Sequence, residues 1–238
     1  MKKPSGYIIY EGKSELNGGN IVAIVTMSSK NIKTGNMASM WILNADIPPT
    51  KASKQGEDAS VCGDCKHRAV NNGACYVTLH HAPLQVYKSY KRGNYPIAND
   101  MTIFEGMKVR FGAYGDPSAI PTQILASIKA VVKNNTSYTH QWKQGNKILK
   151  QVSMASVDSI AEQKQAVSEG WRTFRVTSDL SDKLPNEIVC PNTTKAIQCA
   201  DCGLCSGTSS KARNIVIEVH GAKKKKFVKQ QELTTQQG

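Results

Sequence analysis

Short runs of β-branched and aromatic residues open the chain and alternate with turn sequences. Tyr7–Tyr10, Ile21–Met27 and Met40–Leu43 are such runs, and Gly18-Gly19 and a Lys-Thr-Gly-Asn turn separate them. Strand-forming residues bounded by glycine and asparagine are typical of antiparallel strands joined by turns. We therefore expect residues 1–45 to form an antiparallel N-terminal extension.

Later in the chain, strand-like runs alternate with amphipathic segments, which predicts a parallel sheet with right-handed crossovers. The expected strands are Met40–Leu43, Lys108–Tyr114, Ser137–Trp142, Gln151–Val157, Arg172–Thr177 and Asn214–His220; the expected helices are Pro83–Lys91, Pro121–Lys133 and Ser159–Glu169; Ile47–Gly56 is expected to be a loop. Six strands predict an α/β fold of the partial (β/α)6-barrel type, as one domain over residues 1–221. An open doubly wound sheet is the alternative.

The chain carries a formal charge of +13, from 31 Lys and Arg against 18 Asp and Glu, so a nucleic acid is an expected partner. Solubility alone is the competing explanation of this charge. Residues 222–238 form a lysine-rich tail, which we expect to be disordered. The candidate phosphate contacts are Lys88, Lys91, Arg92, Lys223, Lys224, Lys225 and Lys226.

The sequence has no apolar run of 18 residues, and the start of the chain lacks the apolar stretch of a secretory signal. We expect a globular protein of the cytoplasm with no membrane partner. In such a reducing compartment, cysteines in CxxC spacings favour metal binding over disulfides.

All seven cysteines fall into two groups. The second group, Cys190, Cys199, Cys202 and Cys205, contains a C-x2-C-x2-C run typical of [4Fe–4S] clusters, although four thiolates also suit structural zinc. The first group, Cys62, Cys65 and Cys75, leaves one coordination position open. His67, His80 or His81 could complete a zinc site there; otherwise one iron of a cluster stays free of protein ligands.

Polar residues also lie at the carboxyl ends of several of the predicted strands. They are Gly115-Asp116-Pro117, His140-Gln141-Trp142, Ser156-Val157-Asp158, and Arg175 or Thr177. The carboxyl ends of parallel strands meet at one edge, so these residues predict a pocket. Each also has an ordinary structural explanation: Asp116 belongs to a turn, Ser156 and Asp158 can cap a helix, and Trp142 can belong to the core.

A cysteine triplet after the first strand of a six-strand partial barrel, with a Gly- and acid-containing turn after the second, resembles the radical S-adenosylmethionine enzymes. In that superfamily three cysteines hold a [4Fe–4S] cluster whose fourth iron binds S-adenosylmethionine. The resemblance implies that Cys62, Cys65 and Cys75 hold the cluster, and that the cofactor contacts are Gly112, Gly115, Asp116, Ser156 and Asp158. The family spacing is CxxxCxxC, whereas this chain has CxxC followed by nine residues and Cys75.

The segments Cys62-Gly-Asp-Cys65-Lys-His-Arg, Tyr90-Lys-Arg-Gly-Asn-Tyr95 and Cys202-Gly-Leu-Cys205 are similar to a group of uncharacterised bacteriophage proteins. Some members of that group are labelled as associated with rolling-circle replication. This resemblance implies a phage origin and a bacterial host.

Three functions follow as hypotheses. The first is a radical S-adenosylmethionine-like enzyme that acts on a nucleic acid or nucleotide and receives electrons from a donor. The second is a non-catalytic, zinc-stabilised DNA- or RNA-binding protein. The third is a nicking nuclease that uses Tyr87 or Tyr90 with His80 and His81. It is the least favoured, because adjacent histidines on a strand point to opposite sides and could not both bind one metal ion.

Overall fold

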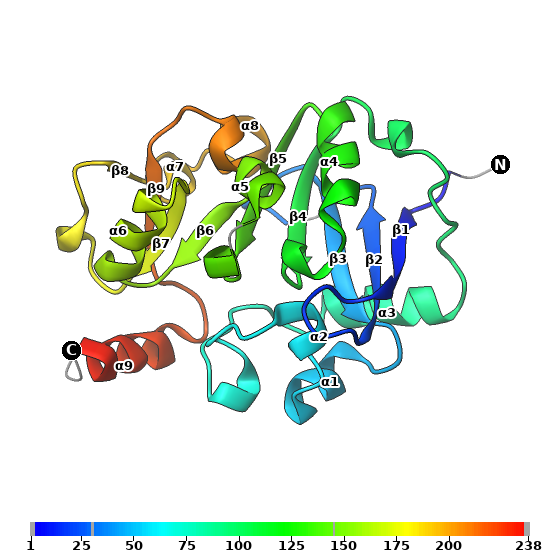
Figure 1. Cartoon of the computed structure of the whole chain (residues 1–238), viewed down its shortest axis with the longest axis horizontal. Helices are drawn as coiled ribbons and strands as arrows, with labels where there is room; N and C mark the ends of the chain where they lie inside the picture. The colour runs from blue at the N-terminus through cyan, green and yellow to red at the C-terminus, as the bar shows by residue number, and fades with distance from the viewer. Residues whose placement is uncertain (1–2, 30, 145, 236–238) are drawn as a thin grey trace.

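The computed structural model describes residues 3–29, 31–144 and 146–235, which form an α/β structure around a nine-stranded sheet (Figure 1). The strands are β1 (Gly6–Lys13), β2 (Asn20–Thr26), β3 (Ala38–Asn44), β4 (Lys108–Tyr114), β5 (Asn134–Thr139), β6 (Met154–Val157), β7 (Thr173–Thr177), β8 (Glu187–Val189) and β9 (Asn214–Glu218). The α-helices are α1 (Pro49–Gln55), α2 (Ala59–Cys62), α3 (Ala82–Lys91), α4 (Thr122–Val131), α5 (Lys147–Val152), α6 (Ile160–Ser168), α7 (Pro191–Lys195), α8 (Cys199–Cys202) and α9 (Lys224–Thr235). None of the helices in this described part has the length and apolar character needed to span a bilayer.

The strand order is β1-β2-β3-β4-β5-β6-β7-β9-β8. β1, β2 and β3 pair antiparallel, and from β3 onward every pair of neighbours is parallel. The α/β class and the antiparallel N-terminal extension are therefore confirmed. The six expected strands are neighbours in chain order, without the reversal that defines a doubly wound sheet, so that alternative is wrong. The sheet is not closed.

The core explains why these runs become strands. Five consecutive residues of β2, Ile21 to Val25, are fully buried, as are Ile42 in β3 and Phe111 in β4. Leu125 and Ile128 of α4 pack in the same cluster, because residues three apart lie on one helix face. In Figure 1, α4, α5 and α6 lie on the viewer's side of the sheet. A common side is expected for right-handed crossovers between strands added in chain order.

Several short elements differ from the sequence predictions. The expected strand Ser137–Trp142 is β5, which covers Asn134–Thr139 and is followed by a turn that contains Trp142. Ile47–Gly56 contains α1, with Pro49 as its first residue. The expected strand Gln151–Val157 begins only at Met154, because α5 occupies the preceding residues, capped by the Asn146 side chain. The sequence analysis also missed β8, a strand of three residues at the sheet edge.

The lysine-rich tail, which we expected to be disordered, contains helix α9. Phe227 is 5% exposed and packs against Ala74 and Val219. One aromatic side chain among the lysines thus fixes the helix on the body of the protein, beside the loop that carries the first cysteine group (Figure 1).

Candidate metal and cofactor site

The first cysteine group lies at the carboxyl ends of the parallel strands. Cys62 is the last residue of α2, which follows β3 through α1. The backbone N–H of Asp116, just after β4, donates to the carbonyl of Val61 at 2.6 Å. This bond joins the cysteine loop directly to the turn after the next strand.

Arg68 holds the cysteine loop in shape. Its guanidinium pairs with Asp58 at 2.8 Å and donates to the carbonyls of Gly56 and Gly63 at 2.6 and 2.9 Å. The N–H of Cys75 donates to the carbonyl of His67 at 3.0 Å. Cys75 is therefore brought back toward the CxxC pair although nine residues separate it from Cys65.

The three thiols lie close enough to influence one another electrostatically. Burial raises the pKa of Cys62 well above its usual value, and Asp58, Cys65 and Cys75 raise it further. Burial raises the pKa of Cys65 to about 12, while the backbone N–H of His67 bonds its sulfur and acts in the opposite direction. The N–H of Val77 does the same for Cys75. A bound cation would stabilise the thiolate forms and so lower these pKa values.

The glycine- and acid-containing turn after β4 is tightly packed. Gly115 has φ +82°, and a Cβ atom there would lie 2.7 Å from the Cβ of Ile42. Gly112 has φ +68°, and a Cβ atom there would lie 2.7 Å from the carbonyl oxygen of Gly115. The buried carboxylate of Asp116 accepts from Ser118, from the Thr139 hydroxyl at 2.7 Å and from the His140 N–H at 2.8 Å. Asp116 thus fixes the ends of β4 and β5 relative to each other, and its oxygens already have partners.

A cluster of ionisable side chains adjoins the cysteine loop. Nε2 of His67 lies 2.6 Å from Oδ2 of Asp158, and Nζ of Lys66 lies 3.1 Å from the same oxygen. The His67 and His140 rings meet edge to face with centroids 5.5 Å apart. Burial by itself would raise the pKa of Asp158, but the hydrogen bond and charge of His67, with Lys66 and His140, hold it below its usual range. Burial lowers the pKa of His140. Asp158 is therefore an anion with cationic or polar neighbours.

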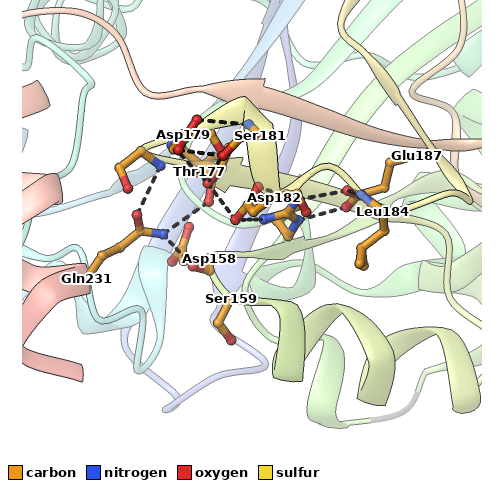
Figure 2. A network of polar contacts seen from close by, with 12 residues as sticks. Asp158, Ser159, Thr177, Asp179, Ser181, Asp182, Leu184, Glu187 and Gln231 are labelled. Carbon is orange, nitrogen blue, oxygen red and sulfur yellow. Dashed lines mark hydrogen bonds and ion pairs between the residues drawn. The ribbon is translucent and has the colours of Figure 1, made fainter. Parts of the chain in front are cut away.

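Helix α9 covers this cluster. The Phe227 ring stacks on the His67 ring with centroids 5.7 Å apart. Gln231 donates to the backbone carbonyl of Asp158 at 2.7 Å and accepts from the Ser178 N–H at 3.0 Å (Figure 2). The sequence analysis did not assign Phe227 or Gln231 a role. The single aromatic residue after four lysines was the signal available.

The predicted pocket residues after β6 and β7 divide into two kinds. Asp158 joins the ionisable cluster, and Ser156 is buried within β6. Arg175, in contrast, is 1% exposed and forms ion pairs with Asp182 and Glu187 at 2.8 Å each. Thr177 bonds Asp182 at 3.0 Å, in the network that Figure 2 shows. Arg175 and Thr177 therefore belong to a structural network on β7.

The second cysteine group surrounds a cavity of about 20 Å³, which is lined by Cys190, Cys199, Cys202 and Cys205. Asp201 and Gly203 of this loop lie against Lys108 and Asn134, the first residues of β4 and β5. The second group is thus near the amino ends of these strands, away from the first group. In Figure 1, α8 lies above the sheet and α2 lies below it, at opposite ends of the strands.

One buried and one partly buried side chain support the second group. Arg172 donates to the carbonyls of Leu204, Gly207 and Arg213 at 2.8, 2.9 and 2.6 Å. Burial raises the pKa of Cys205 to about 12, although a hydrogen bond from Tyr138 acts against this rise. The four thiols thus line one small cavity, in a loop held by backbone contacts, but among the described residues their sulfur atoms do not all lie within 4.8 Å of one another.

The basic residues predicted to bind nucleic acid lie in two separate places. Lys88, Lys91 and Arg92 are exposed on and after α3, whereas Lys223, Lys224, Lys225 and Lys226 are at the start of α9. These helices are on opposite sides of the molecule in Figure 1. The structure does not bring the two sets together.

The tyrosines considered for DNA nicking have structural partners. Tyr87 is 6% exposed and donates to the carbonyl of Asp46 at 2.9 Å. Tyr90 bonds the Glu11 carboxylate at 2.5 Å, and both this bond and burial raise its pKa. His80 and His81 are exposed. This arrangement does not resemble a nucleophile beside a two-histidine metal site.

The site therefore consists of three cysteines, a fixed glycine–aspartate turn and a histidine–aspartate cluster at one edge of a parallel sheet, with a four-cysteine loop near the other edge. No protein-family model, curated protein sequence or solved structure matches this chain.

Proposed function

We propose that this protein is an iron–sulfur enzyme of the radical S-adenosylmethionine type. The observation that carries the proposal is the convergence of Cys62, Cys65 and Cys75 at the carboxyl edge of a sheet whose parallel strands follow chain order. That order is the one expected for a partial barrel, and the carboxyl edge is where such folds place their functional groups. The bond from Asp116 to Val61 adds the turn after β4 to the same site.

The donor set fits a cluster with one iron open to a further ligand. Three thiols can take three iron corners, and the N–H bonds to the Cys65 and Cys75 sulfurs stabilise their thiolates. When bound, such a cluster supplies an electron to S-adenosylmethionine held at its free iron. This electron must come from a donor protein or a small reductant.

The chain's own residues would shape the cofactor site. Gly112 and Gly115 let the turn after β4 pack closely on itself and on Ile42, so they shape the site without leaving open space, and Asp116 fixes the turn instead of offering a free carboxylate. The Asp158 carboxylate is already paired with His67 and Lys66, so it is a weaker candidate for contact with the cofactor. Ser156 is the remaining candidate contact.

The charge of +13 supports a nucleic acid or nucleotide substrate. The lysines of α9 are the better candidates for phosphate contact, because α9 covers the histidine–aspartate cluster. On this proposal the second cysteine group holds a structural metal, either a further [4Fe–4S] cluster or zinc, that fixes the loop between β8 and β9. On this proposal the enzyme acts in a bacterial host, which the similarity of its cysteine segments to bacteriophage proteins would imply.

A zinc-stabilised nucleic-acid-binding protein is the second candidate. The small cavity among four cysteines favours it, because a single ion closed by four thiolates is a structural site. In that case the first group would hold zinc as well, and the surface charge would provide the binding function.

Metal analysis of two matched variants tests the proposal. After anaerobic purification we expect about four irons and four sulfides to be lost when Cys62, Cys65 and Cys75 are replaced by alanine. Replacement of Cys202 and Cys205 should leave the iron of the first group in place. Zinc without iron in the unmodified protein would reject the cluster and favour the second candidate.

A further inference from the structure

Three side chains outside the cysteine groups meet in one place. His67 comes from the cysteine loop, His140 follows β5 and Asp158 follows β6. One nitrogen or oxygen atom from each lies within 4.8 Å of the others. Asp158 is 5% exposed and His67 is 13% exposed, so the group is largely removed from water.

Two imidazoles and a carboxylate form a common donor set for divalent transition metals. Bonds of about 2.0 to 2.2 Å from such an ion place its ligand atoms about 3 Å apart. The observed distance between His67 Nε2 and Asp158 Oδ2 is 2.6 Å, which is shorter than this. The ligand atoms of all three residues lie within 4.8 Å of one another, so the other separations can be longer. Small side-chain movements would therefore satisfy a single ion.

The surroundings fix these three residues from outside. The Asp158 N–H donates to Glu162 at 2.9 Å, and its carbonyl accepts from Gln231 at 2.7 Å. The backbone N–H of His140 donates to Asp116 at 2.8 Å. Metal ligands are typically held by such a second set of contacts, because these set the direction of the donor atoms.

A simple histidine–aspartate hydrogen bond does not account for the whole cluster. Nδ1 of His67 is buried and has no hydrogen-bond partner among the described residues, and the His140 ring approaches without a hydrogen bond of its own in that set. Lys66 now balances Asp158, but its side chain is 52% exposed and can move into water. A divalent cation could take its place.

We propose that His67, His140 and Asp158 bind a single divalent first-row transition-metal ion, separate from the metals of the two cysteine groups. Such an ion would keep coordination positions open and could act as a Lewis acid beside the cysteine site. Phe227 covers His67 and limits access of water from that side. The inference does not rest on the cluster at the cysteines, because its ligands are nitrogen and oxygen atoms.

Cobalt(II) provides the test, because its visible bands report on its ligands and thiolate ligation adds an intense charge-transfer band. The protein is used as purified, with its cysteine sites in the state in which they are isolated. We expect one equivalent of cobalt(II) to bind without the thiolate band. Binding should weaken at least about tenfold in His140→Gln and in Asp158→Asn.

Cys65→Ser is the matched control and should retain this equivalent. His140→Gln is not expected to destabilise the fold, because no side-chain hydrogen bond of His140 is lost among the described contacts. Urea unfolding measures the stability of both variants. The proposal is overturned if no such equivalent binds, or if binding is unchanged in His140→Gln and Asp158→Asn. A thiolate band that weakens in His140→Gln and Asp158→Asn and disappears in Cys65→Ser would also overturn it, because His67 would then belong to the cysteine site.

Discussion

At the scale of single residues, Arg175 shows how a strand-end residue can be structural. Its guanidinium lies between the carboxylates of Glu187, which is fully buried, and Asp182, which is half-buried. Charges inside a protein require partners because removing them from water is costly. The pairing fixes β7 against the segment that leads to β8 (Figure 2).

Glu187→Leu should lower the free energy of unfolding by about 3 kcal/mol, because it leaves Arg175 without its buried partner. Urea denaturation measures this loss. The double variant Arg175→Met, Glu187→Leu should recover part of it, since both charges are then absent. A single variant as stable as the wild type would contradict the structural role.

Gly63, between Cys62 and Cys65, has φ +58° and ψ −135°, a conformation that side chains avoid. A Cβ atom there would also lie 2.7 Å from the side chain of Gln141. Gly63→Ala should therefore lower stability by about 2 kcal/mol and reduce the metal content of the first group. Gly93→Ala is the control: φ is +71°, but no atom lies within 4 Å of its Cβ. Equal losses in both variants would show that the loop tolerates a side chain at Gly63.

At the scale of elements, α9 connects the end of the chain to the candidate site. Its contacts with the body include the buried Phe227 and hydrogen bonds that join Gln231 to Asp158, Val176 and Ser178. Because the helix is mostly polar, its stability depends on these contacts more than on helix propensity.

Phe227→Ala should release α9 and lower the free energy of unfolding by roughly 3 kcal/mol. Hydrogen exchange of residues 224–235 should become fast while β2 stays protected. Lys229→Ala, an exposed substitution on the same helix, should change neither property. Slow exchange in α9 of Phe227→Ala would mean that other contacts hold the helix.

Sequence patterns predicted the strands that have continuous apolar burial and missed elements fixed by a few specific contacts. Lys108–Tyr114 was predicted with its observed bounds, because its apolar residues fill the core. α9 depends on the packing of Phe227 against Ala74 and Val219. This contact joins distant parts of the sequence, so no local sequence pattern predicts it. His140 was placed correctly at a strand end. Its approach to His67 is a tertiary contact between distant residues, beyond the reach of spacing arguments.

At the scale of the whole molecule, the charge of +13 divides between separate surfaces, of which α3 and α9 are two (Figure 1). If α9 lies at the substrate entrance, its lysines should dominate the contacts with a short oligonucleotide. Phosphate contacts release counterions, so each lost contact reduces the salt dependence of binding.

Replacement of Lys223, Lys224, Lys225 and Lys226 by glutamine should reduce the slope of log K against log salt by up to about 4. Replacement of Lys88, Lys91 and Arg92 should leave the slope for a short oligonucleotide nearly unchanged. Fluorescence anisotropy at several salt concentrations measures both. A larger effect from the α3 variant would move the binding surface to the other side of the molecule.

The electron paramagnetic resonance spectrum of the reduced, anaerobically purified protein, recorded with and without S-adenosylmethionine, tests the central claim most directly. We expect a [4Fe–4S] signal that changes when S-adenosylmethionine is added and that is absent from Cys65→Ala. A protein without a cluster signal, or with a signal that S-adenosylmethionine leaves unchanged, would not be a radical S-adenosylmethionine enzyme.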